Sequence, residues 1–246
     1  MLGLRAVIAG VCLVAMHACQ KSSDVPTAPG TIAASQTTVG LTVCHRTGDG
    51  GAYIRMSISS GDVAAHLAHG DAPVGDMVPG QSGQRFDAQC NAIAMAPVSV
   101  SFRELAVNGE PFVSYLENGI NVAAESAPWE AMTGYGSPAP AIIFRQAASV
   151  PPTTGVVQVT MAGELFAFAS VDVYSSVTTI PYTIVGTRNG QRVFSMSATV
   201  PNTFGRFATI VNSAPLMVTE LRIELTQPFL AFGSNPMGLD NITIKR

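Results

Sequence analysis

Apolar and polar residues alternate along most of the chain between residue 97 and the C-terminus. In residues 180–200 two such runs flank Asn189-Gly190, a dipeptide that supplies the two positive-φ residues of a tight type I′ turn, so the segment predicts a β-hairpin. Comparable runs predict strands near residues 98–103, 112–115, 120–123, 141–144, 156–161, 165–174, 182–187, 193–200, 207–211, 221–226 and 239–244. No amphipathic helical pattern interrupts them, which favours a mainly β fold with two packed sheets over residues 97–246.

Two local patterns sharpen this prediction. Leu221, Ile223 and Leu225 alternate with charged residues, as in a strand that has one buried and one wet face. The apolar parity changes between Phe168 and Val171, and a β-bulge near residue 169 would keep both side chains on the core face.

Composition narrows the class of protein. The chain has 246 residues, of which 47% are hydrophobic and only 12% charged, and its net charge is −3. This composition gives no excess of basic residues of the kind that binds nucleic acid. We therefore do not expect nucleic acid as a partner.

The first 40 residues have a different pattern. Arg5 precedes an apolar run over residues 6–16 that is too short to span a bilayer but suits an export signal. The run and the following His17-Ala18-Cys19 resemble a bacterial lipoprotein signal. The resemblance implies a signal peptide over residues 1–18, a lipid on Cys19 and, with Gln20 next, sorting to the outer membrane. Ordinary cleavage, with Cys19 as an unrelated thiol, is the alternative. Residues 19–40 are rich in Ser, Thr, Pro and Ala and predict a flexible tether.

The cysteines of the exported part indicate one disulfide. Once Cys12 leaves with the signal and Cys19 carries lipid, Cys44 and Cys90 remain, and two cysteines in an oxidising compartment most simply pair. They enclose a small module over residues 41–92. Its pattern predicts two short strands and one helix that Ser60 caps and Gly70 ends.

This segment resembles a small module of secreted bacterial proteins. The matching parts are Cys44-His45, the AHLAHGD run at residues 65–71 and Cys90, and the resemblance implies no established activity.

The module holds every histidine of the predicted mature chain. His45, His66, His69 and Asp71 could bind zinc or another transition metal, because imidazole and carboxylate are suitable ligands. Their spacing matches no strong zinc signature. The alternative is that they cap the helix and hydrogen-bond the disulfide loop.

The C-terminal region resembles galactose-binding-like jelly-roll domains, which include carbohydrate-binding modules. The matching segments are VSVSFREL at 98–105, SVDVYSS with PYTIVGTRNGQ at 170–191, and NPMGLDNITI at 235–244. The resemblance implies a structural calcium that ties the first strand to the last, and Glu104 and Asp240 are the matching positions. Alternatively, Asp240 binds only neighbouring backbone amides.

Residues 124–140 contain the second candidate site. Trp129, the only tryptophan, lies near Glu130 and Tyr135 in a segment rich in Gly and Pro, and exposed aromatic rings beside polar groups can hold sugars. In the other interpretation Trp129 fills one end of the sandwich core.

Three functions follow from these patterns. The first is a lipid-anchored surface protein whose non-catalytic sandwich binds a glycan or another surface protein. The second is a metal-dependent hydrolase that uses His45, His66, His69 and Asp71, and the third is a structural envelope protein. The sequence contains no Gly-x-Ser-x-Gly, HExxH or phosphate-binding loop, and the predicted sandwich has no histidine to act as a general base. We therefore expect a binding protein rather than an enzyme.

Overall fold

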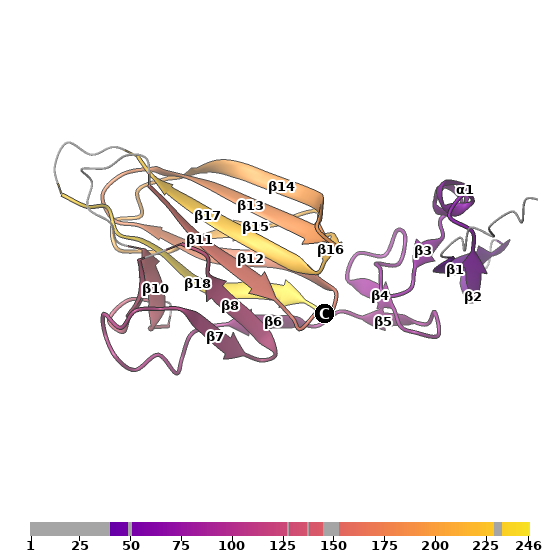
Figure 1. The fold of residues 1–246 in the computed structure, drawn as a ribbon, viewed down its shortest axis with the longest axis horizontal. Coiled ribbons are helices and arrows are strands. Elements are labelled where there is room, and N and C mark those ends of the chain that lie inside the picture. Colours follow the sequence, from indigo (N-terminus) through magenta and orange to yellow (C-terminus); the bar gives the residue numbers. More distant parts are fainter. Residues whose placement is uncertain (1–39, 49–50, 127, 137, 145–152, 229–232) are drawn as a thin grey trace, which may run out of the picture. The chain divides into compact units, whose positions relative to one another are not determined.

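The computed structural model describes residues 40–48, 51–126, 128–136, 138–144, 153–228 and 233–246 (Figure 1). The predicted signal peptide, Cys19 and almost all of the predicted tether lie outside these residues. In the described part of the chain, no helix is both long enough and apolar enough to cross a membrane.

Residues 97–246 form a β-sandwich of the predicted jelly-roll class. One sheet has the order β15-β12-β18-β10-β9, with β16 beside β12 and β6 beside β18. The other has the order β14-β13-β17-β11-β8-β7. The strands of the first sheet are β6 (Pro97–Val100), β9 (Trp129–Met132), β10 (Ala141–Phe144), β12 (Phe166–Ser175), β15 (Ala208–Val211), β16 (Met217–Val218) and β18 (Met237–Lys245). Those of the second are β7 (Ser114–Glu117), β8 (Ile120–Ala124), β11 (Thr153–Thr160), β13 (Ile180–Arg188), β14 (Gln191–Val200) and β17 (Glu220–Gln227).

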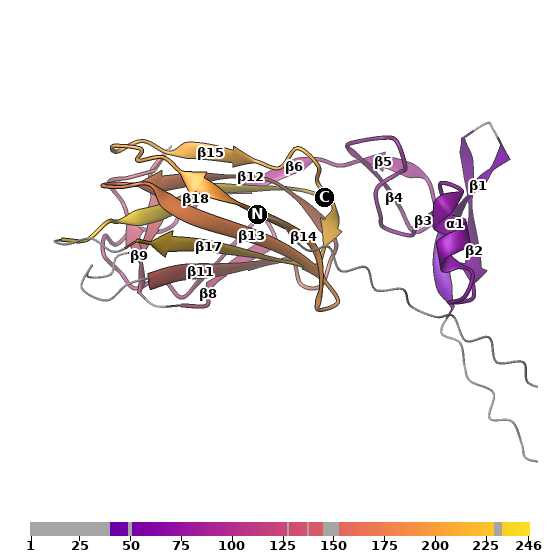
Figure 2. The same ribbon diagram turned by 90° about the horizontal axis from the view of Figure 1, so that it is seen from above.

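The core lies between these sheets and follows the predicted alternation. In β17, Leu221, Ile223 and Leu225 are fully buried, whereas the residues between them are half-buried. β11 and β17 run side by side in both views (Figures 1 and 2), paired antiparallel from Thr153–Gln227 to Thr160–Glu220.

The structure confirms the predicted hairpin turn and the predicted β-bulge. Asn189 and Gly190 have φ angles of 52° and 76°, and they join β13 to β14 in an antiparallel pair. The register of β12 against β18 shifts between Phe168 and Asp172, so that Phe168 and Val171 both reach the core. Alternation and turn chemistry therefore fix the register of these strands.

One predicted loop contains a strand. Trp129–Met132 forms β9 and pairs with β10, because Trp129 and Ala131 turn toward the core and the residues between them turn outward. An alternating run of four residues beside a Gly- and Pro-rich segment was too short to indicate this strand.

The N-terminal module combines short strands with one helix. β1 (Leu41–Thr47) lies between β2 (Ala52–Ile58) and β3 (Ala72–Pro73), helix α1 spans Val63–Ala68, and β4 (Gln84–Phe86) pairs with β5 (Ala92–Ala94). Gly70 follows the helix with a φ of 85°, as predicted. The predicted cap is wrong: Asp62 occupies the N-cap position, and its carboxylate accepts a hydrogen bond from Ser59 Oγ at 2.7 Å.

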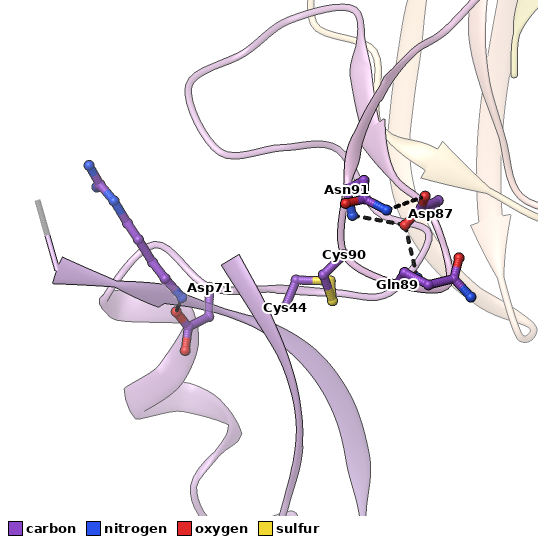
Figure 3. The surroundings of a disulfide bond; sticks show 7 residues. Cys44, Asp71, Asp87, Gln89, Cys90 and Asn91 are labelled. Carbon is purple, nitrogen blue, oxygen red and sulfur yellow. Dashed lines mark hydrogen bonds between the residues drawn. A yellow bond between two sulfur atoms is a disulfide. The ribbon is translucent and has the colours of Figure 1, made fainter. Parts of the chain in front are cut away.

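The predicted disulfide joins Cys44 to Cys90, with a Cα–Cα distance of 5.4 Å (Figure 3). Cys90 has a φ of 67°, and the Asp87 carboxylate holds its turn by accepting the backbone N–H groups of Gln89 and Asn91, each at 2.8 Å. The cross-link therefore joins the buried Cys44 of β1 to a tightly bonded turn.

Candidate functional site

The outer face of the first sheet carries a cleft above β12. Val171 and Val173 point into the core, so Asp172 and Tyr174 between and after them lie on the opposite face. The cleft has a volume of about 500 Å³. Its lining consists of Gly134, Tyr135, Gly136, Asp172, Gly205, Arg206, Phe207 and Thr209.

Two aromatic residues, Tyr135 and Phe207, line the cleft, and both contact the ring of Tyr174. Tyr174 is buried beneath Tyr135 on one side and Phe207 on the other, with ring centroids 5.7 Å and 5.5 Å away. Tyr135 is 44% exposed. The edge-on contact with Tyr174 therefore supports the ring of Tyr135 while leaving part of its surface exposed.

Polar groups complete the cleft. The Asp172 carboxylate accepts hydrogen bonds from Thr209 Oγ1 at 2.5 Å and from Asn241 Nδ2 at 2.9 Å, so neighbouring strands hold its orientation. Arg206 is exposed at the rim and can donate hydrogen bonds. The site offers an acceptor, a donor and an aromatic surface within one hollow.

The loop before β15 is pinned to the end of β12. Thr203 donates its N–H and its Oγ1–H to the carbonyl of Ser175, at 3.0 and 2.9 Å. Asn202 Oδ1 accepts the N–H of Phe204, which has a φ of 46° and is 83% exposed. A bulky residue in the left-handed region is unusual, and here it presents an aromatic ring to solvent next to the cleft residue Gly205.

The structure separates the three predicted ligand-binding residues. Tyr135 lines the cleft. Trp129 is only 2% exposed and packs on Phe144 in the core, with ring centroids 5.5 Å apart. Its ring is therefore not available at the surface, which supports the core interpretation. Glu130 is half-buried on β9, opposite Ile143 of β10.

The two residues predicted to bind calcium have different surroundings. Asp240 is fully buried, and its Oδ1 accepts the N–H of Asn241 at 2.7 Å. Glu104 is exposed, and its N–H donates to the hydroxyl of Tyr115 at 3.2 Å. A different carboxylate, Glu117, holds the chain after β6 by accepting the N–H groups of residues 101 and 102, at 2.7 and 3.0 Å. The calcium site stays a prediction.

The module brings His45, His66 and Asp71 together. Both imidazole Nδ1 atoms lie near Asp71 Oδ2, at 2.8 Å for His45 and 2.6 Å for His66. His69 is exposed at the end of α1 and is not part of this three-residue group. Burial raises the pKa of Asp71, but hydrogen bonds from the Arg46 N–H and both imidazoles outweigh it, so the pKa lies below its usual 3.8. The carboxylate is therefore ionised at neutral pH.

Most of the cleft was not identified from the sequence. Alternation along β12 places Asp172 and Tyr174 on the same face, so the sequence pattern could have indicated that these two side chains are neighbours. Arg206 and Phe207 lie in a loop whose position depends on the fold, so no local pattern indicated them.

Among known proteins, the chain is similar only to solved structures, and only distantly. No family model matches the chain, and no curated protein matches it. A solved DUF4465 family protein from Bacteroides caccae is 11% identical, with a TM-score of 0.38 over 61% of this chain and 98% of its own. A family 32 carbohydrate-binding module from C. perfringens NanJ, solved in complex with galactose, is 13% identical, with a TM-score of 0.34 over 52% of this chain and 98% of its own. The family 29 module CBM29_1 from Piromyces equi is 10% identical, with a TM-score of 0.36 over 62% and 91%. Similarity at this level is too distant to indicate a ligand.

Proposed function

We propose that this is an exported, lipid-anchored protein of the outer membrane whose β-sandwich binds carbohydrate without catalysis. The observation that carries the proposal is the cleft on β12, which is lined by the partly exposed Tyr135, by Asp172 and by Arg206.

The chemistry of the cleft suits a sugar. A pyranose ring has an apolar face of C–H groups and a rim of hydroxyls, so it needs an aromatic surface and fixed polar groups together. Tyr135 supplies the surface, Asp172 can accept hydrogen bonds from hydroxyls, and Arg206 can donate them.

The same lining argues for binding rather than hydrolysis. Glycoside hydrolysis ordinarily uses two carboxyl groups on either side of the scissile bond. Among the residues that line the cleft, Asp172 is the one carboxylate. A cleft with one carboxylate that is already held by Thr209 and Asn241 is better suited to recognition.

Two features support export and anchoring. The apolar run over residues 6–16, followed shortly by Cys19, resembles a lipoprotein signal. The Cys44–Cys90 disulfide is consistent with an oxidising compartment, where such bonds persist.

A glycan array followed by calorimetry on the purified full chain tests the binding function. We expect a glycan that binds the wild-type chain to bind Tyr135→Ala at least about tenfold more weakly, because the aromatic surface is lost. Asp172→Asn, which keeps the size of the side chain, should weaken binding as well. Leu116→Ala is the matched control, because Leu116 is a 67% exposed apolar residue on the other sheet. Absence of glycan binding, or equal binding by Tyr135→Ala and wild type, would refute the proposal.

Detergent partitioning tests the anchor separately. We expect the wild-type chain from a bacterial membrane fraction to enter the detergent phase and Cys19→Ser to stay in the aqueous phase. Retention of Cys19→Ser in the detergent phase contradicts lipidation of Cys19.

A further inference from the structure

We infer that His45, His66 and Asp71 form a three-ligand binding site for a divalent transition-metal ion such as Zn²⁺. This site lies in the N-terminal module and does not depend on the proposed sugar cleft. One ligand atom from each of the three residues lies within 4.8 Å of the others.

Three separate segments bring the ligands to one place. His45 follows the disulfide residue Cys44 on β1, His66 lies in the last turn of α1, and Asp71 comes directly after Gly70 and before β3. Because β1 pairs with β3, with Cys44 opposite Ala72, the sheet holds Asp71 against His45. The frame of the site is therefore set by backbone pairing and a covalent cross-link.

The carboxylate of Asp71 is directed at the two imidazoles. Its side chain is fully buried, and Oδ1 accepts the N–H of Arg46 at 2.8 Å. Oδ2 accepts both imidazoles. Each Nδ1 is within hydrogen-bond distance of Oδ2, and in the imidazole tautomer that forms both bonds the hydrogen lies on Nδ1.

A metal ion can replace these two hydrogens. Neutral imidazole can move its proton to Nε2, which frees the Nδ1 lone pair for the ion without a net loss of protons. Tetrahedral zinc with bonds near 2.0–2.1 Å places its ligand atoms about 3.3 Å apart. The Nδ1–Oδ2 distances of 2.8 and 2.6 Å must therefore grow by about 0.5 and 0.7 Å when the ion binds.

Geometry and exposure leave room for the rest of the coordination shell. The two imidazole planes meet at 77°, so their nitrogens approach the ion from different directions. The imidazole side chains are 31% and 22% exposed, which gives an ion access and leaves its outer position to water. Two imidazoles and one carboxylate are a ligand set that zinc and its neighbours prefer.

Calorimetric titration of the untagged, oxidised full chain with Zn²⁺ tests the site. The protein is first treated with EDTA, and the thiols outside the Cys44–Cys90 disulfide are alkylated so that they cannot bind the metal. We expect one equivalent of Zn²⁺ to bind. Co²⁺ should bind the same site and give visible d–d absorption bands of a site with nitrogen and oxygen ligands.

His66 and His69 both lie at the C-terminal end of α1, so substitutions of these two residues can be compared directly. His66→Gln should bind Zn²⁺ at least about tenfold more weakly, as expected for loss of a ligand. His69→Gln should bind like wild type, because His69 lies outside the group. Hydrogen exchange of residues 63–74 without metal checks that both variants are folded, and Asp71→Asn gives a second test that preserves side-chain size.

Wild-type protein that binds no stoichiometric Zn²⁺ overturns the inference. Equal weakening by His66→Gln and His69→Gln, with both variants folded, also overturns it. In either case the three residues form only a hydrogen-bonded support for the module.

Discussion

The N-terminal module and the β-sandwich are stabilised by different kinds of interaction. The module buries a small cluster that consists of Cys44, Ala72, Val78, Phe86 and Cys90. The sandwich buries a much larger apolar cluster to which both sheets contribute. In the module a covalent bond and the buried Asp71 carboxylate supplement a small core, whereas the sandwich has a much larger apolar cluster with a few buried polar residues such as Asp240.

This difference determines where chemistry can reside. A small core leaves polar groups such as Asp71 to hold segments together, so the same groups that support the fold can bind an ion. In the sandwich the large apolar core lies between the sheets, so residues of the outer face and loops such as Tyr135 remain exposed and available for the proposed ligand.

The largest expected effect comes from removal of the disulfide. Cys44 and Cys90 are 46 residues apart, and a loop of that length contributes about 4 kcal/mol in the chain-entropy model. We expect Cys44→Ser with Cys90→Ser to unfold the module and leave the sandwich folded. Hydrogen exchange should then show rapid exchange in residues 41–74 and unchanged protection in β11, β13 and β17.

If the double variant keeps its module folded, the module and the sandwich are both stabilised by apolar packing without a cross-link. Unchanged protection of residues 41–74 in the double variant would mean that the small apolar cluster is sufficient by itself. A matched control is Ala88→Ser, which places a serine at an exposed position of the turn before Cys90 and leaves the Cys44–Cys90 bond intact.

The next effect distinguishes a core residue from a surface residue within the sandwich. Trp129→Ala should lower the free energy of unfolding by about 3–5 kcal/mol, because it empties a large volume beside Phe144. Tyr135→Ala, six residues later, should lower it far less, because Tyr135 is partly exposed. Chemical denaturation followed by circular dichroism measures both. Equal losses would show that Tyr135 belongs to the structural core.

Local patterns were sufficient for much of the fold. The hairpin at Asn189-Gly190 follows from two residues that tolerate positive φ, and the bulge follows from a change of apolar parity in β12. The disulfide follows from the count of cysteines together with the predicted export signal. Each of these signals lies in neighbouring residues or in composition, which a sequence displays directly.

The candidate sites required information that a sequence does not display. The cleft joins Tyr135, Asp172 and Phe207 from three segments, and only the folded sheet brings them together. Trp129 has the composition of an exposed binding loop around it, but strand β9 turns its ring inward. In the module, histidine content indicated a cluster, while the geometry retained His45 and His66 and left His69 outside.

The smallest expected effect concerns the hairpin turn, where no core packing is involved. Gly190 has a φ of 76°, and an added Cβ would have no heavy atom within 4 Å, so Gly190→Ala should cost only the left-handed conformation, about 1 kcal/mol. Gly186 in the same hairpin is the contrasting case, because an added Cβ would lie 2.2 Å from the ring of Phe194 and 2.7 Å from Val218. Gly186→Ala should therefore cost more than Gly190→Ala in the same denaturation experiment. A larger loss at Gly190 would mean that the turn, rather than the apolar core behind it, holds β13 and β14 in register.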